Sequence, residues 1–123
     1  EVNVAGGRVR NSDGDVLGPG MEAFLSSYMF DFGVYGVAGV GEHGTLLDFN
    51  EDEVRARQLI HENSRTTMLV LDHSKFGRTA HVRGGQIGQA TKVFCDTRPP
   101  ELIREGLENS GSQLLICGED EVE

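Results

Sequence analysis

A continuous apolar run, Met68–Leu71, leads directly into a polar and charged segment, Asp72–Arg78. An apolar run of this length that is bounded by turn-forming residues is typical of a strand buried on both faces of a sheet. Polar side chains at the carboxyl end of such a strand lie where open α/β sheets bind their ligands. The pattern therefore predicts a central strand over residues 68–71, followed by a ligand-binding loop.

Shorter apolar segments predict the remaining strands. They are Glu1–Ala5, Phe32–Val37, Lys92–Cys95 and Gln113–Cys117. Between the first of these and the next, residues 8–15 are polar and rich in turn formers, which predicts an excursion or a hairpin loop. Residues 84–90 have neither a helical nor a strand period, so we expect them to be irregular with at most one helical turn.

Three stretches carry helix signals. An apolar stripe with helical spacing between Met21 and Tyr28 predicts a helix over residues 20–29. The second helix begins after Asn50, a good N-cap residue, and Glu53 is placed to complete a near capping box. The third occupies residues 101–110, because Pro100 suits the start of a helix and Gly111 suits its end. Strands and helices therefore alternate, which predicts an α/β domain with a largely parallel sheet.

The charges of the second helix have two interpretations. Glu51–Arg55 and Glu53–Arg57 are spaced i, i+4 in the favourable order and would pair on a solvated face. Glu53 and Arg55 are equally compatible with a role at the ligand site, and the sequence leaves both interpretations open.

Two glycine patterns are candidates for binding a phosphate group. Gly39, Gly41 and Gly44 match the spacing GxGxxG, but the residues that follow do not begin a helix, so we reject a dinucleotide fingerprint. Gly6 and Gly7 follow the first predicted strand. Paired glycines there form a tight turn or let backbone N–H groups approach a phosphate closely.

Composition and charge narrow the function. The 123 residues fit one domain, and the net charge of −9 repels phosphate backbones, so this chain is not expected to bind nucleic acid itself. Cys95 and Cys117 have no zinc-ligand spacing, and we expect two buried free thiols in a reducing compartment. With no signal peptide and no membrane-length apolar run, we expect a cytoplasmic location and no membrane partner.

Lys75 is the first residue we name as a ligand for an anion. Its ammonium is a mobile point charge that suits phosphate, and Arg78 is a second cation nearby. The plainer interpretation is that Asp72 and Lys75 are polar residues of the loop after the strand and bind no ligand. A metal-dependent hydrolase built from histidines and Asp72 is disfavoured, because the spacings match no ordinary zinc pattern; no metal and no cofactor are expected.

Four segments together resemble the DeoR family of bacterial transcriptional repressors. They are DFGVYGVAG at Asp31–Gly39, GTLL at Gly44–Leu47, EVR at Glu53–Arg55 and DHSKFGR at Asp72–Arg78. The resemblance lies in the carboxyl-terminal effector-sensing domain and extends to about Cys117. It implies a Rossmann-like α/β fold of the sugar isomerase and CoA-transferase group, a phosphorylated effector, and no enzymatic activity.

The resemblance also implies site residues. Lys75 and Asp72 match the family's Asp-x-x-Lys, with Lys75 contacting the ligand phosphate. Gly6 and Gly7 match a Gly-Gly that lines the site, and the Glu53 and Arg55 motif recurs in the family. A sugar-phosphate isomerase of the same fold is the alternative, with Glu53 or Asp72 as its base.

The chain lacks parts that the family has. The winged helix-turn-helix, through which operator DNA would be bound, is absent, and so is a phosphate-binding Asp-x-Gly-Thr-Thr loop. We therefore expect residues 1–117 to be a partial, truncated sensing domain and residues 118–123 to be a disordered acidic tail. A truncated sheet leaves an exposed edge and an apolar face, which predicts self-association into a homo-oligomer.

Overall fold

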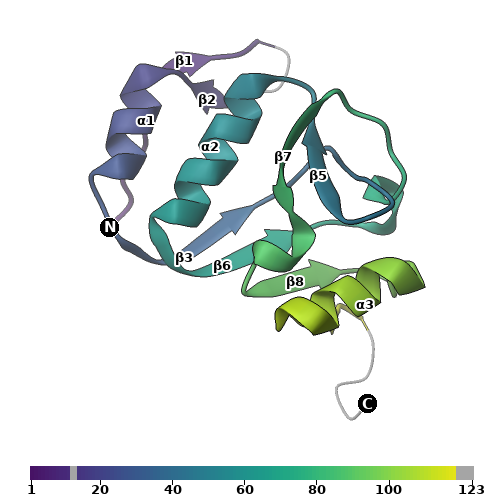
Figure 1. The fold of residues 1–123 in the computed structure, drawn as a ribbon. Coiled ribbons are helices and arrows are strands. Elements are labelled where there is room, and N and C mark those ends of the chain that lie inside the picture. The colour runs from purple at the N-terminus through teal and green to yellow at the C-terminus, as the bar shows by residue number, and fades with distance from the viewer. Residues whose placement is uncertain (12–13, 119–123) are drawn as a thin grey trace.

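The computed structural model describes residues 1–11 and 14–118. Its helices are α1 (Pro19–Ser26), α2 (Glu51–Glu62) and α3 (Glu101–Ser110), with short 3-10 turns η1 (His73–Lys75) and η2 (Ile87–Gln89). Its strands are β1 (Arg8–Val9), β2 (Val16–Leu17), β3 (Phe30–Tyr35), β4 (Gly39–Val40), β5 (Thr45–Asp48), β6 (Ser64–Val70), β7 (Val82–Gln86), β8 (Lys92–Cys95) and β9 (Gln113–Ile116). They form a hairpin and two sheets, with α1 and α2 side by side (Figure 1).

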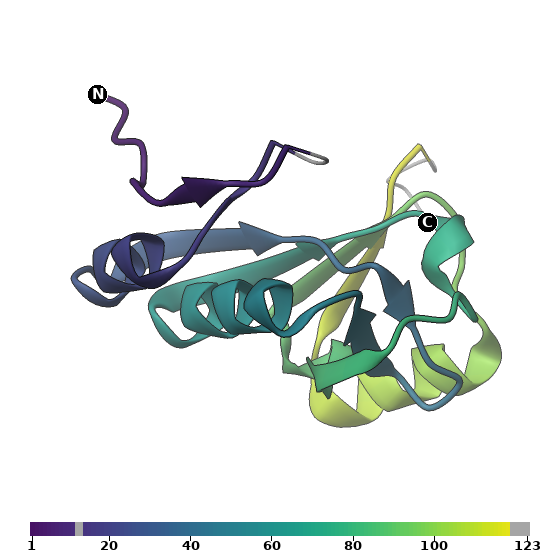
Figure 2. The same ribbon diagram turned by 90° about the horizontal axis from the view of Figure 1, so that it is seen from above.

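The central layer is a four-stranded parallel sheet in the order β3-β6-β8-β9. Alternate residues of its strands are buried on one face, including Tyr35, Leu69 and Val93. Helices α2 and α3 lie on that side of the sheet (Figure 2), and α1 packs against α2 and β2. The predicted fold class, a Rossmann-like α/β domain with a largely parallel sheet and flanking helices, is confirmed.

The opposite face of the sheet is open within the described residues. Phe32, Val34 and Val70 point to that face and are 63%, 59% and 49% exposed. The prediction of a strand buried on both faces is therefore wrong: β6 occupies the centre of the sheet but has only one covered face. An apolar run cannot distinguish a strand that is covered twice from one that is covered once.

A second, antiparallel sheet in the order β4-β5-β7 was not predicted. Its strand β7 includes part of the segment expected to be irregular, although η2 supplies the expected helical turn. The strand contains Gly84 and Gly85, which weaken strand propensity. Gly84 is required here because a Cβ would lie 2.3 Å from Val54 Cγ1 on α2. The glycine is needed for close packing against α2, and because glycine is a poor strand former, the sequence did not indicate a strand here.

The amino-terminal segment also differs from expectation. Residues 1–5 form no strand, and Val2 and Val4 are 88% and 82% exposed. Although Val2 and Val4 alternate with polar residues, this segment pairs with no strand among the described residues. The hairpin interpretation of the next segment is confirmed, because β1 pairs antiparallel with β2, with Arg8 opposite Leu17.

The helices follow their local signals closely. The Asn50 side chain accepts a hydrogen bond from the Glu53 N–H at 3.0 Å, so α2 begins where predicted. Gly111 ends α3 with a φ of 80°, a left-handed conformation that favours glycine. Helix α1 is shorter than expected and ends at Ser26, with the predicted stripe residue Tyr28 exposed.

The main core lies between the parallel sheet, the small sheet and α3. Its most buried members include Val40, Leu46, Leu69, Val93 and Leu107. Of the two cysteines, Cys95 is buried as expected and Cys117 is exposed, so the prediction of two buried thiols is half wrong. Burial raises the pKa of the Cys95 thiol. Residues 119–123, most of the predicted tail, lie outside the described residues.

Candidate functional site

A cavity of about 520 Å³ opens where the β1–β2 hairpin, the carboxyl end of β3, the first turns of α2 and the loop after β6 meet. The carboxyl ends of β3 and β6 lie side by side because the strands are parallel, with Tyr35 opposite Leu69. Ligands bind outside the carboxyl ends of strands in open α/β sheets. The position of the cavity therefore agrees with the position predicted for a ligand.

Three cations line this cavity: Lys75, Arg78 and Arg57, of which Arg57 is paired with Asp48. Lys75 is the last residue of η1, directly after the central strand. The Arg78 guanidinium lies 5.5 Å from the centre of the Phe49 ring, a cation–π contact that holds it near the start of α2. The two residues that the sequence offered as anion ligands thus lie on one cavity.

Glu53 lies on the same cavity and has three roles in its wall. Its N–H is capped by Asn50, and its Oε2 accepts a hydrogen bond from the Phe49 N–H at 3.1 Å. Its Oε1 accepts a hydrogen bond from Arg10 Nη2 at 2.7 Å. The Asn50 half of the predicted capping box is thus confirmed, whereas the Glu53 side chain accepts from the Phe49 N–H and not from the Asn50 N–H. Glu53 is also a member of the candidate site.

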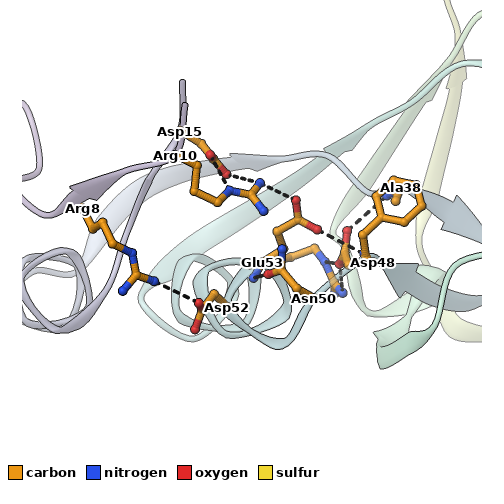
Figure 3. Close-up of polar contacts among 10 residues, drawn as sticks. Arg8, Arg10, Asp15, Ala38, Asp48, Asn50, Asp52 and Glu53 are labelled. Carbon is orange, nitrogen blue, oxygen red and sulfur yellow. Dashed lines mark hydrogen bonds and ion pairs between the residues drawn. The ribbon is translucent and has the colours of Figure 1, made fainter. Parts of the chain in front are cut away.

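Arg10 connects the hairpin to helix α2 (Figure 3). Its Nε and Nη2 donate to the two carboxylate oxygens of Asp15 at 2.8 and 2.7 Å. Hydrogen bonds to Asp15 and then to Glu53 raise the pKa of Arg10, and Arg10 lowers the pKa of the Asp15 carboxyl. Sequence analysis missed Arg10, because its partner on α2 is 43 residues away and no local pattern connects them.

A buried ion pair supports the floor of the site. Arg57 donates to Asp48 Oδ2 from Nη2 at 2.6 Å and from Nε at 3.1 Å, and it also donates to the Gly84 carbonyl. Asp48 Oδ1 accepts from the Ala38 N–H at 3.1 Å. Both side chains line the cavity, and their contacts join the loop after β3 to β5, α2 and β7.

The predicted i, i+4 pairs on α2 are wrong. Arg57 pairs with Asp48 instead of Glu53, and Arg55 pairs with Glu22 of α1 at 3.2 Å instead of Glu51. In both cases a partner from another element is better placed than the partner one turn away. Tertiary contacts override the weak preference of neighbouring charges on a helix.

The turn that carries Lys75 is held by two aspartates. Asp72 accepts hydrogen bonds from the Ser74 N–H at 2.8 Å and from the Ser74 hydroxyl. Asp96, which follows β8, accepts from the His73 N–H at 2.8 Å and contacts His73 Nδ1 at 2.6 Å.

These contacts shift three pKa values. Hydrogen bonds from Ser74 lower the pKa of Asp72, the contact with Asp96 raises the pKa of His73, and His73 lowers the pKa of Asp96. Asp72 does not line the cavity and acts on the turn instead.

The other predicted site residues lie away from the cavity lining. Gly7 packs inside the hairpin, where a Cβ would lie 2.7 Å from the Leu17 carbonyl oxygen, and a Cβ on Gly6 would meet open space. Arg55 is exposed on the side of α2 that faces α1. Of the six predicted site residues, Lys75 and Glu53 line the same cavity. Asp72 belongs to the turn that carries Lys75. The remaining three, Gly6, Gly7 and Arg55, are not part of the cavity lining.

A Rossmann-like sheet with a polar cavity at the carboxyl ends of its strands defines an α/β ligand-binding domain. The chain matches the DeoR C terminal sensor domain over residues 1–97, and it belongs to that family. The family resemblance noted in the sequence is thereby confirmed.

Several curated relatives are transcription regulators. The glycerol-3-phosphate regulon repressor of Escherichia coli (strain K12) is 42% identical over 116 residues, which cover 94% of this chain and 46% of the relative. The repressor of the same name from Haemophilus influenzae is 35% identical, covering 95% of this chain and 45% of the relative. The HTH-type transcriptional repressor CsqR of Escherichia coli (strain K12) is 29% identical, covering 98% and 46%. The chain therefore spans about half the length of these relatives.

No helix within residues 1–11 and 14–118 is long and apolar enough to cross a membrane. Over the same residues, no three side chains of the metal-binding types are grouped closely enough to hold a metal ion.

Proposed function

We propose that this chain is the effector-sensing part of a bacterial transcriptional repressor and that it binds a phosphorylated polyol in the cavity beside Lys75. The observation that carries the proposal is the distribution of charge: Lys75 and Arg78 line the same cavity as the carboxylates of Asp15 and Glu53. Cations bind a phosphate group, and carboxylate oxygens accept hydrogen bonds from hydroxyl groups. A ligand with both kinds of group would use both parts of the cavity.

Glycerol 3-phosphate is the effector we propose. Two relatives that are 42% and 35% identical are named as repressors of the glycerol-3-phosphate regulon. In a longer protein with a winged helix-turn-helix, binding of the effector would weaken the affinity for operator DNA. The chain itself, with a net charge of −9, would make no contact with DNA.

Sensing requires no chemical step, and we propose that the chain is not an enzyme. The alternative, a sugar-phosphate isomerase, would use Glu53 as a base beside Lys75. Against it, the relatives that are 42%, 35% and 29% identical are named as transcriptional repressors. Turnover of an aldose or ketose phosphate by this chain, lost in Lys75→Ala, would establish the isomerase instead.

The test is calorimetric titration of the chain with glycerol 3-phosphate, inorganic phosphate and a hexose phosphate. We expect saturable binding of glycerol 3-phosphate that weakens by about tenfold or more in Lys75→Ala, because a charged hydrogen bond to the phosphate is lost. Lys92→Ala is the matched control, since Lys92, the only other lysine, lies on β8. Equal affinity in Lys75→Ala and Lys92→Ala would contradict the assignment of Lys75.

We also propose that the chain self-associates through the open face of the parallel sheet. Phe32 and Val34 lie on β3, which is an edge strand, and are more than half exposed. Contiguous apolar surface at an unpaired edge favours association with a second copy. Light scattering should show a mass above that of the monomer, which Phe32→Ser reduces; a monomer at high concentration would contradict the proposal.

A further inference from the structure

The backbone of Arg10 is hydrogen-bonded within the hairpin, while its side chain extends to helix α2. Its N–H donates to the Asp15 carbonyl at 3.0 Å, and its carbonyl accepts from the Gly14 N–H at 2.8 Å. The hairpin itself is anchored by Leu17, which is 2% exposed. From this fixed point the guanidinium extends to the first turn of α2, where it meets Glu53 (Figure 3).

Both carboxylates that hold Arg10 also line the cavity. Asp15 and Glu53 belong to the cavity lining, and their carboxylates accept hydrogen bonds from the Arg10 guanidinium. The planar fork of an arginine matches a phosphate as well as it matches a carboxylate. A phosphate ester that enters the cavity therefore competes with Glu53 for Arg10, and its hydroxyl groups compete with Arg10 for Glu53.

The charges of the site favour this exchange. Lys75 and Arg78 line the cavity together with Asp15 and Glu53, and Asp48 and Arg57 form an ion pair in the same lining. Arg10 is not part of the lining but is bonded to Asp15 and Glu53, so an anion drawn in by Lys75 and Arg78 comes close to its guanidinium. With Arg10 on the phosphate, the carboxylate of Glu53 is free to accept a hydrogen bond from a polyol hydroxyl.

We propose that Arg10 is a ligand-binding residue: its guanidinium exchanges the carboxylate of Glu53 for the anionic group of the ligand. This inference rests on the proposed function, because it concerns the same cavity and the same class of ligand. It assigns Arg10 a role that no sequence pattern indicates.

The experiment measures the affinity of glycerol 3-phosphate by calorimetry at about 50 and about 300 mM salt, for the unsubstituted chain and for three variants. Arg10→Gln should weaken binding by about ten- to a hundredfold, and Arg10→Lys should restore part of the loss, because a lysine keeps the charge without the fork. Arg8→Gln is the matched control: Arg8 lies on the same hairpin and donates to Asp52 at 3.3 Å, and Asp52, unlike the Arg10 partners Asp15 and Glu53, does not line the cavity.

The salt dependence separates a ligand contact from a merely structural role. If Arg10 touches the phosphate, Arg10→Gln should reduce the loss of affinity between the two salt concentrations, because one screened attraction is gone. If Arg10 only steadies the hairpin, the salt dependence stays as in the unsubstituted chain and Arg10→Lys behaves like Arg10→Gln. That second result overturns the inference.

The failure of this inference can be distinguished from the failure of the proposed function. If the unsubstituted chain binds glycerol 3-phosphate and Arg10→Gln binds it equally well, the inference alone is overturned. If the unsubstituted chain binds neither glycerol 3-phosphate nor inorganic phosphate, the proposed function fails and the inference fails with it. Circular dichroism of Arg10→Gln should match the unsubstituted chain, and Arg10→Lys supplies the comparison if the hairpin is perturbed.

Discussion

Two ion pairs of equal length lie in opposite environments in this molecule. Arg57 and Asp48 are 2.6 Å apart, with side chains 7% and 8% exposed. His73 and Asp96 are also 2.6 Å apart, with side chains 69% and 43% exposed. The first pair joins several elements beneath the cavity, whereas the second fastens the turn that carries Lys75 to the end of β8.

The distance between two charges does not by itself decide how much an ion pair contributes to the stability of the fold. A buried charge that loses its partner cannot recover the hydration it gave up, so either residue of the buried pair is required by the other. An exposed pair exchanges readily with water and is screened by salt. We therefore expect the buried pair to control stability and the exposed pair to control the local geometry of the turn.

The largest effect should come from breaking the buried pair. Arg57→Met keeps most of the length of the side chain but leaves Asp48 as an uncompensated buried carboxylate. We expect the free energy of unfolding, measured by urea denaturation, to fall by about 3–5 kcal/mol. Arg55→Met on the same helix removes a half-exposed arginine that pairs with Glu22, and it should cost at most about 1 kcal/mol. Equal losses in the two variants would refute the comparison.

Removing both charges together should cost less than removing one. In the double variant Asp48→Leu with Arg57→Met, no charge remains buried, and the Ala38 N–H keeps its second acceptor, the Leu47 carbonyl. We expect the double variant to recover about half or more of the stability lost in Arg57→Met alone. The same urea experiment measures it; a double variant that is less stable than Arg57→Met would show that the charges act independently.

The smallest effect should come from the exposed pair, as a dependence on pH. Because Asp96 raises the pKa of His73, the stabilisation is complete below the pKa of an unfolded histidine and is lost as pH rises through the raised value. Asp96, whose pKa is lowered, loses its contribution when pH falls through that lowered value.

NMR titration of the imidazole checks this prediction. The pKa of His73 should fall toward about 6.5 in Asp96→Asn. His81, which lies on an exposed position outside the pair, supplies reference resonances in the same spectra. A His73 pKa that is identical with and without the Asp96 carboxylate would show that the contact does not persist in solution.

The elements that could be predicted are those whose signals are local. Helix α2 follows from Asn50 and Glu53, and α3 follows from Pro100 and Gly111, because caps act within one turn of the chain. Strand β7 was missed because the reason for Gly84 lies on another element, at the Val54 side chain. The sequence shows that residue 84 is a glycine, but it does not show which neighbouring side chain requires a glycine there.

The same distinction applies to the site. Lys75 could be proposed from its position after an apolar strand, and for Glu53 the charges of the helix left a site role open that the family resemblance then favoured. Arg10 was missed, and Arg57 was given the wrong partner, because their contacts join segments that become neighbours only in the folded chain. Side chains that bridge elements carry no periodic signal, so this part of the site required the structure.

Phe49 joins the acidic and the basic parts of the cavity within one residue. Its N–H donates to Glu53, and its ring lies against the Arg78 guanidinium. A change in either partner therefore alters the magnetic environment of the same residue, through the hydrogen bond at the backbone or through the cation near the ring. The amide resonance of Phe49 is thus a single spectroscopic reporter for both ends of a bound molecule.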